Sequence, residues 1–296
     1  ASGVVSQNWG PTLRGGFGLA LRKVCCSLGR DTCRECELAR CCAYGYVFET
    51  PVFADATVMR KYPEAPHPFV FEPNQHGKSF VREGEQFCSA LVLVGHAISY
   101  LPQFFLALEE LGAQGLGRGR VRYRVERIAT SDGQVIYQRG LDSQFRRAEL
   151  KWLSLEPGTS ATGRFDLVFQ TPTRIVVAGQ LSGDFGLLDI VKALSRRVFL
   201  LRHFHCGGCT EPIADEFLEA ARDARCLSRK LTWIEAERFS TRQQRTIPIG
   251  GVVGRITCEG DLGLLRPLLR AGQYVHVGKN ATFGLGKFTV VEGSRA

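Results

Sequence analysis

The sequence predicts an α+β protein made of two tandem domains, and three observations support this fold class. The chain has 296 residues, which is enough for two cores of ordinary size. A predicted helix, a glycine-rich segment and a strand follow one another twice, once in each half. A polar stretch, EPGTSATG at residues 156–163, separates the halves. We therefore predict domains over residues 1–156 and 157–296.

The first half contains two predicted helices. Apolar residues at helical spacing predict one helix at residues 11–24 and a second at 98–111, which ends at a glycine. Between them, the β-branched and apolar residues of 87–94 predict a buried strand. The glycine-rich loop 112–119 leads into residues 121–125, whose alternation of apolar and charged residues predicts another strand.

The second half repeats this order, with one helix that has the character of an insertion. Its predicted elements are strands at 165–169, 231–237 and 252–258, helices at 187–201, 212–227 and 262–271, and a closing strand after the glycine-rich loop 278–287. The two copies predict two tandem ferredoxin-like (RRM-like, βαββαβ) domains with glycine-rich loops and a small cysteine-rich loop at residues 25–42.

Composition and charge narrow the classes of function. Apolar residues make up 44% and charged residues 23%, which excludes a disordered chain. No run of 18 apolar residues exists, so no membrane partner is expected. The N-terminus lacks a basic start followed by an apolar segment, so we expect a cytoplasmic protein. Lys and Arg number 38 against 29 Asp and Glu, and this surplus of nine positive charges favours a polyanion such as nucleic acid.

Six cysteines lie within residues 25–42. In a protein of this size, such clustering is typical of metal ligands rather than of disulfides. Four of them follow the pattern C-x7-C-x2-C-x5-C, and four thiolates suit tetrahedral zinc. An iron–sulfur cluster uses the same ligands, and free thiols are the third possibility. A closed site of four thiolates would be structural rather than catalytic. The predicted ligands are Cys25, Cys33, Cys36 and Cys42.

Both glycine-rich loops precede a strand instead of following one, which is the reverse of a dinucleotide-binding fingerprint. With lysines and arginines around them, the loops predict contact between backbone amides and an RNA backbone. The alternative is a tight turn with surface cations. The segment ERFSTRQQRTIPIGG adds further donors for phosphates and base edges. The candidate RNA-binding residues are Arg14, Arg118, Arg120, Arg238, Arg242, Gln243, Arg245, Lys279, Gly284, Gly286 and Lys287.

The C-terminal segment GQYVHVGKNATFGLGKFTV resembles the closing motif of the CRISPR-associated repeat endoribonucleases, the Cas-six group of the RAMP superfamily. Four further segments are similar to a zinc-loop-bearing branch of that family. They are LRGGFGLALRKVC, CRECELARCCAYGYVFET, LGAQGLGRGRVRY and WIEAERFSTRQQRTIPIGG. Together, these segments span nearly the whole chain in the order of the family.

The resemblance implies an enzyme that binds the repeat of a CRISPR precursor transcript and cuts it once per repeat. It implies attack by the ribose 2′-hydroxyl, a 2′,3′-cyclic phosphate product, no catalytic metal, retention of the mature crRNA, and CRISPR effector subunits as partners. Many relatives carry a histidine soon after the first helix, and this chain has none between Leu13 and Pro66. The alternative is therefore a non-catalytic crRNA-binding subunit. The candidate catalytic residues are His205 and His76, which we expect in polar loops open to solvent and substrate, and Tyr46.

Overall fold

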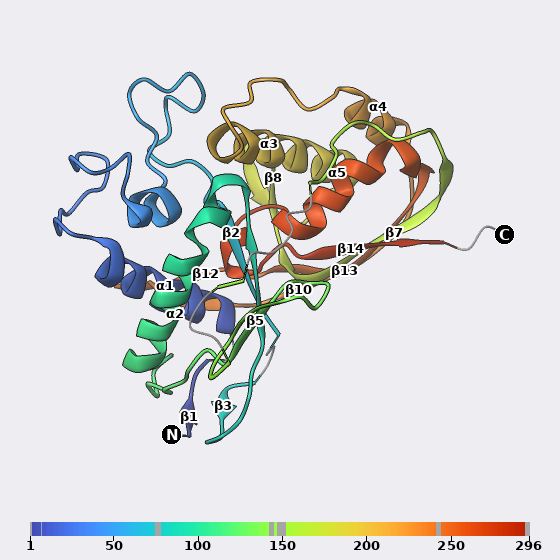
Figure 1. Cartoon of the computed structure of the whole chain (residues 1–296). Helices are drawn as coiled ribbons and strands as arrows, with labels where there is room; N and C mark the ends of the chain where they lie inside the picture. The colour runs from blue at the N-terminus through green and yellow to red at the C-terminus, as the bar shows by residue number, and fades with distance from the viewer. Residues whose placement is uncertain are drawn as a thin grey trace. The chain divides into compact units, whose positions relative to one another are not determined.

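The computed structural model describes residues 2–6, 8–74, 78–141, 145–146, 152–240 and 244–293 (Figure 1). Contacts divide the chain into two units. The N-terminal unit consists of residues 1–67, 75–88 and 96–152, and the C-terminal unit of residues 68–74, 89–95 and 153–296. The units are thus not continuous in sequence, and the domain boundary placed after residue 156 stays a prediction.

The C-terminal unit is built on a four-stranded antiparallel sheet in the order β10-β13-β7-β14. Along the chain, helices separate these strands in the sequence βαββαβ. This order and topology define a ferredoxin-like sheet and confirm the predicted fold class. The strands and principal helices are β7 (Thr162–Thr173), α3 (Leu187–His205), β10 (Arg225–Ile234), β13 (Gly251–Asp261), α5 (Leu262–Val275) and β14 (Phe288–Glu292).

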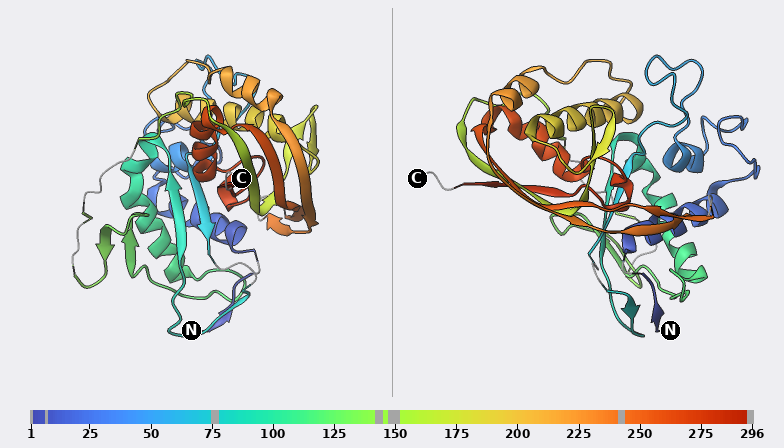
Figure 2. Two further views of the ribbon diagram at one scale, coloured as in Figure 1. Left: turned by 90° about the vertical axis from the view of Figure 1, so that its right-hand side faces the viewer. Right: turned by 180° about the vertical axis from the view of Figure 1, so that it is seen from behind.

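Helices α3, α4 (Glu216–Asp223) and α5 cover one face of this sheet (Figures 1 and 2). The alternating residues Phe165, Leu167 and Phe169 point from β7 into the core beneath α3 and α5. Helix α4 is shorter than the predicted helix at 212–227, because pairing with β13 begins β10 at Arg225.

Three two-stranded antiparallel pairs accompany the sheet in the described part of the C-terminal unit. The pair β8 (Ile175–Val177) and β9 (Gln180–Ser182) follows β7 in the sequence. The pair β11 (Glu237–Ser240) and β12 (Arg245–Pro248) comes between β10 and β13 along the chain. The third, β2 (Phe69–Pro73) with β4 (Ser89–Leu93), comes from the first half of the sequence but groups with the C-terminal unit. It brings Glu72 next to the C-terminal glycine-rich loop.

The N-terminal unit is organised around two helices, α1 (Trp9–Cys25) and α2 (Leu101–Gln114), which confirm the two predicted ones. Their packing is centred on the stacked rings of Phe17 and Phe104, 4.9 Å apart. Its remaining elements are β1 (Gly3–Val4) paired with β3 (Phe80–Val81), β5 (Arg127–Ala129) paired with β6 (Val135–Gln138), a π-helical turn (Gly45–Glu49) and a 3-10 helix (Gly95–Tyr100).

The strand predicted at residues 121–125 is wrong. Val121 forms a single bridge with Leu116, and the residues after it join no ladder. The Tyr123 amide instead donates to the Gly112 carbonyl oxygen at 3.2 Å, at the end of α2. The alternation of residue types is real, but a strand also requires a neighbouring strand to accept its hydrogen bonds.

Among the residues that the structure describes, no helix is long and apolar enough to cross a membrane.

Candidate functional site

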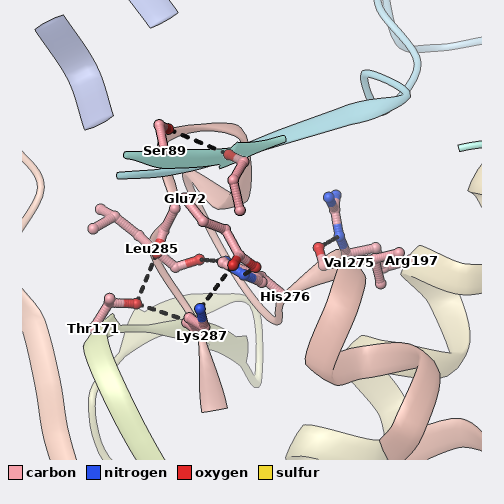
Figure 3. Close-up of polar contacts among 10 residues, drawn as sticks. Glu72, Ser89, Thr171, Arg197, Val275, His276, Leu285 and Lys287 are labelled. Carbon is pink, nitrogen blue, oxygen red and sulfur yellow. Dashed lines mark hydrogen bonds and ion pairs between the residues drawn. The ribbon is translucent and has the colours of Figure 1, made fainter. Parts of the chain in front are cut away.

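An ion network surrounds the glycine-rich loop 278–287 of the C-terminal unit (Figure 3). The two Glu72 carboxylate oxygens lie 2.7 Å from His276 Nε2 and 2.7 Å from Lys287 Nζ. His276 Nδ1 lies 3.0 Å from the Leu285 carbonyl oxygen. Both partners of the imidazole are oxygen atoms that can accept hydrogen bonds. The Glu72 carboxylate therefore contacts both the His276 ring and the Lys287 ammonium.

The environment of Glu72 has opposing effects on its pKa. Burial raises it, but hydrogen bonds from His276 and Lys287, together with their positive charges, outweigh burial and lower it overall. The His276 side chain is fully buried and the Glu72 side chain is 13% exposed. Such a network is costly to disrupt, because removing one partner leaves buried charge behind.

The glycines of this loop face the chain's own backbone. Gly284 and Gly286 are buried, and a Cβ atom at Gly286 would collide with the Val277 carbonyl oxygen. The Gly286 amide donates to the Pro172 carbonyl oxygen at 3.2 Å, and the Gly284 amide to that of Ala281 at 2.9 Å. The amides expected to contact RNA are thus already used within the fold.

Two lysines of the loop have different surroundings. Lys279 is exposed. Lys287 is half-buried, and its ammonium group donates to the Glu72 carboxylate. The Lys287 backbone amide donates to Thr171 Oγ1 at 2.9 Å. The Thr171 hydroxyl in turn donates to the Gly284 carbonyl oxygen at 2.9 Å. The loop therefore exposes the Lys279 side chain, whereas the Gly284 and Gly286 amides are used within the fold.

In the first glycine-rich loop, as in the second, the glycines pack against the chain and cationic side chains are exposed. Gly117 and Gly119 approach the backbone around β1, and the Gly119 amide donates to the Val4 carbonyl oxygen at 2.9 Å. Arg118 and Arg120 are exposed on this turn. Close packing against the chain itself explains the glycines, while the arginines are open to a phosphate backbone.

Two other candidate arginines lie against aromatic rings. The Arg14 guanidinium is 3.9 Å from the centre of the Phe48 ring, and Arg14 Nη2 is 3.0 Å from His67 Nε2. The Arg238 guanidinium lies 5.0 Å from the Phe283 ring, and burial lowers its pKa. These contacts hold both side chains within their own unit. Arg245 is exposed on β12, whereas Arg242 and Gln243 lie outside the described residues.

A buried cation that no sequence motif indicates lies on α3. Arg197 Nε donates to the Val275 carbonyl oxygen at 2.7 Å, at the C-terminal end of α5 (Figure 3). Its Nη2 atom is buried without a hydrogen-bond partner among the described residues, and burial lowers the pKa of the guanidinium to about 10. The contact with the last carbonyls of α5 favours this charge, as at other helix C-termini.

The four predicted cysteine ligands are half-buried. Cys25 is the last residue of α1, and the other three follow this helix. Cys33 and Cys42 flank Gly45, with Cβ atoms 4.0 and 3.8 Å from the position that a Gly45 Cβ would occupy. Burial raises the pKa of the Cys33 thiol to about 11, and nearby Glu49 adds to this effect. Within the described part of the chain, no group of three or more His, Cys, Asp or Glu side chains is already placed to hold a metal ion.

The histidines differ in how far their rings are exposed to solvent. His276 is fully buried in its ion network, and His205 is 4% exposed at the end of α3. The solvent-facing loop expected for His205 is therefore wrong, because α3 continues through it and turns the ring inward. His76 lies outside the described residues.

Two further histidines are held by hydrogen bonds. His67 lies between Arg14 Nη2 and Thr50 Oγ1, at 3.0 and 2.9 Å. The Thr50 hydroxyl donates to the Ala65 carbonyl oxygen, so it accepts from His67, and both ring nitrogens are used. His203 Nδ1 lies 3.0 Å from the Cys209 carbonyl oxygen.

His96 differs from the other histidines that the structure describes, because its side chain is the exposed one. Its ring lies 5.5 Å from that of Tyr46, a residue predicted to be catalytic, and 5.4 Å from that of Tyr100. Sequence reasoning gave Tyr46 but not this arrangement, since its members are separated along the chain and no motif connects them.

The βαββαβ sheet and its glycine-rich turn define a ferredoxin-like domain. Two family models match the sequence. Residues 167–288, which include most of this sheet, match that of the CRISPR-associated endoribonuclease Cas6, and residues 3–150 match one described as an N-terminal domain. The matched part of the chain, residues 167–288, belongs to the Cas6 family of CRISPR-associated endoribonucleases. A comparison with curated proteins finds no match.

Solved structures of Cas6 proteins share the fold. A Cas6 product complex is 16% identical, with a TM-score of 0.55 over 98% of this chain and 97% of that chain. Thermus thermophilus Cas6 is 14% identical, with a TM-score of 0.50 over 95% of this chain and 90% of that one. The partial Cas6-RT-Cas1–Cas2 complex is 15% identical, with a TM-score of 0.56 over 100% of this chain and 44% of the other.

Proposed function

We propose that the protein binds the repeat of a CRISPR precursor transcript, cuts it once per repeat and stays bound to the mature crRNA. The observation that carries this proposal is the match of residues 167–288 to the Cas6 endoribonuclease family, over a sheet of ferredoxin-like topology. The likeness to a Cas6 product complex over nearly the whole chain supports it. The surplus of nine positive charges suits an RNA ligand.

The proposed chemistry needs no catalytic metal. The ribose 2′-hydroxyl next to the scissile phosphate attacks the phosphorus, and the 5′-oxygen leaves, which yields a 2′,3′-cyclic phosphate. This reaction requires a base near the 2′-hydroxyl and positive charge near the phosphorane. Histidine, tyrosine, lysine and arginine side chains suffice for these tasks.

The proposed setting is the cytoplasm, and the proposed partners are subunits of a CRISPR effector complex that receive the bound crRNA. Exposed cations such as Arg118, Arg120, Arg245 and Lys279 are suited to hold the RNA backbone.

Cleavage of a labelled repeat RNA in excess EDTA tests the proposed function. We expect a single cut within the repeat and a 2′,3′-cyclic phosphate on the upstream fragment, identified by its resistance to phosphatase until acid opens the ring. The control is the same RNA with a 2′-deoxyribose at the scissile position, which should bind but remain whole. Binding of both RNAs without cutting would instead identify a non-catalytic crRNA-binding subunit.

We further propose that Cys25, Cys33, Cys36 and Cys42 hold a structural zinc ion. Four soft sulfur donors suit zinc, and Cys33 and Cys42 already flank Gly45. Since these side chains are not preassembled into a ligand set, binding would draw the segment after α1 together. The metal would then stabilise a polar segment with few apolar contacts of its own.

Replacing Cys33 and Cys36 together by serine should remove about one equivalent of zinc per chain and lower the melting temperature. Elemental analysis of the purified protein measures both zinc and iron, so an iron–sulfur cluster would be detected in the same experiment. Cys88→Ser, at an exposed cysteine outside the cluster, is the matched control. Equal metal content in all three proteins would contradict the proposed site.

A further inference from the structure

Three aromatic side chains of the N-terminal unit form a cluster that no motif connects. His96 and Tyr100 belong to the 3-10 helix Gly95–Tyr100, and Tyr46 to the π-helical turn Gly45–Glu49. The His96 ring stands edge-on to both tyrosines, at interplanar angles of 70° to Tyr46 and 85° to Tyr100. The two tyrosine rings lie 5.3 Å apart at 32°. Each ring thus contacts the other two.

Local structure fixes the position of Tyr46. The Tyr46 amide donates to the Cys42 carbonyl oxygen at 2.9 Å, and the Thr50 amide closes the turn on that of Gly45 at 2.7 Å. Tyr44 donates from its hydroxyl to Glu49 Oε1 at 2.7 Å across the same turn. The π-helical turn therefore presents Tyr46 from a braced backbone, as such turns often do at functional sites.

The 3-10 helix holds His96 outward. Its neighbour Ala97 is fully buried, and Ser99 Oγ donates to the His96 carbonyl oxygen at 2.7 Å. Tyr100 is followed at once by α2, which packs on α1. The imidazole itself is exposed, and no hydrogen bond holds it among the described residues. It is supported by ring contacts alone, so both of its nitrogens remain available.

We propose that His96 is the proton-transfer residue of the RNA cleavage reaction, and that Tyr46 and Tyr100 are positioning residues that hold its ring. This inference rests on the proposed function. Among the histidines that the structure describes, His96 is suited to it because the reaction needs an imidazole that solvent and substrate can reach. The other described histidines, His67, His203, His205 and His276, are buried or held by hydrogen bonds.

The proton balance of the step is complete. A neutral His96 takes the proton of the 2′-hydroxyl while the 2′-oxygen bonds to phosphorus. The bond between phosphorus and the 5′-oxygen breaks, and the leaving oxygen keeps the electron pair and takes a proton from water. The imidazolium returns its proton to the hydroxide so formed, which resets the enzyme. The products are a 2′,3′-cyclic phosphate and a 5′-hydroxyl.

The test is single-turnover cleavage of the repeat RNA by His96→Ala in EDTA. We expect a loss of about 100-fold or more in the cleavage rate, the usual contribution of a general base, with RNA affinity unchanged. Imidazole added to the buffer should restore part of the rate, which a purely structural role would not allow. His203→Ala, at a half-buried histidine of the C-terminal unit, is the matched control and should keep the wild-type rate.

The positioning role has its own readout. Tyr100→Phe keeps the ring and should keep the cleavage rate, whereas Tyr100→Ala should lower the rate without weakening RNA binding. If His96→Ala cuts within threefold of the wild type, or if imidazole fails to rescue a slow variant, the assignment of His96 is wrong. If the wild-type protein itself binds the repeat without cutting it, the proposed function fails instead, so the two failures are distinct.

Discussion

Replacing Glu72 by alanine should destabilise the C-terminal unit by about 3 to 5 kcal/mol, the usual cost of removing one partner of a buried ion pair. The variant leaves the fully buried His276 and the half-buried Lys287 without their shared carboxylate. It also removes the two side-chain contacts by which Glu72 of β2 holds His276 and Lys287. Urea unfolding, followed by circular dichroism, measures the change.

A matched control for this variant is Glu292→Ala. Glu292 pairs with Arg266 on the surface of the same unit, and both side chains are 53% exposed. Surface ion pairs contribute about 1 kcal/mol or less, so this change should be small. A loss at Glu72 no larger than the loss at Glu292 would show that the buried network does not stabilise the fold.

Acid should remove the contribution of Glu72. Its pKa is lowered in the folded chain, so the unfolded chain binds the proton first as the pH falls. The stabilisation is therefore complete above the unfolded carboxyl pKa of about 4.3 and is lost as the pH falls through the lower folded value. The stability difference between the wild type and Glu72→Gln should shrink across this window.

Replacing Gly286 by alanine should cost about 4 kcal/mol or more, in the range of the most damaging single substitutions. Gly286 has φ +73°, in the left-handed region that side chains disfavour, and its Cβ would collide with the Val277 carbonyl oxygen. The clashing atom is a backbone oxygen and not the end of a flexible side chain that could move away. The Val277 amide also donates to the Gly286 carbonyl oxygen at 3.0 Å, which ties the two backbone segments together. Thermal and urea unfolding measure the loss.

Gly179→Ala separates the two causes of this loss, which are the positive φ angle and the steric clash. Gly179 has φ +81°, close to the value at Gly286, but nothing lies within 4 Å of its missing Cβ. Its substitution should cost about 1 to 2 kcal/mol from backbone strain alone. Equal losses at the two glycines would contradict the close approach at Gly286 and return the loop to an ordinary turn.

Periodicity predicted the elements that bury one face against a core. The helices α1, α3 and α5 and the strand β7 were all expected, because apolar residues at a spacing of 3.6 or 2 have a single way to face a core. The strand predicted from the alternation at residues 121–125 does not form, because alternation alone is not enough for a strand. A strand depends on a partner that the local sequence does not specify, and there the end of α2 accepts the Tyr123 amide instead.

The candidate site, too, was predicted only in part from the sequence. The sequence predicted a basic, glycine-rich loop at 278–287, and the structure has it, but the glycines serve close packing within the chain. The ion network behind the loop had no signal, because Glu72 and His276 are 204 positions apart. His205 was expected in a polar loop, and the continuation of α3 made it a buried residue.

The sequence by itself determined the α+β class, the basic character of the chain, its principal helices and the resemblance to its family. These properties follow from composition, short-range periodicity and local motifs. Tertiary structure alone decided that β2 and β4 group with the C-terminal unit, that Glu72 contacts both His276 and Lys287, and that Tyr46, His96 and Tyr100 meet. The physical reason is that such contacts join distant segments, whose meeting depends on the packing of the whole fold rather than on any local preference.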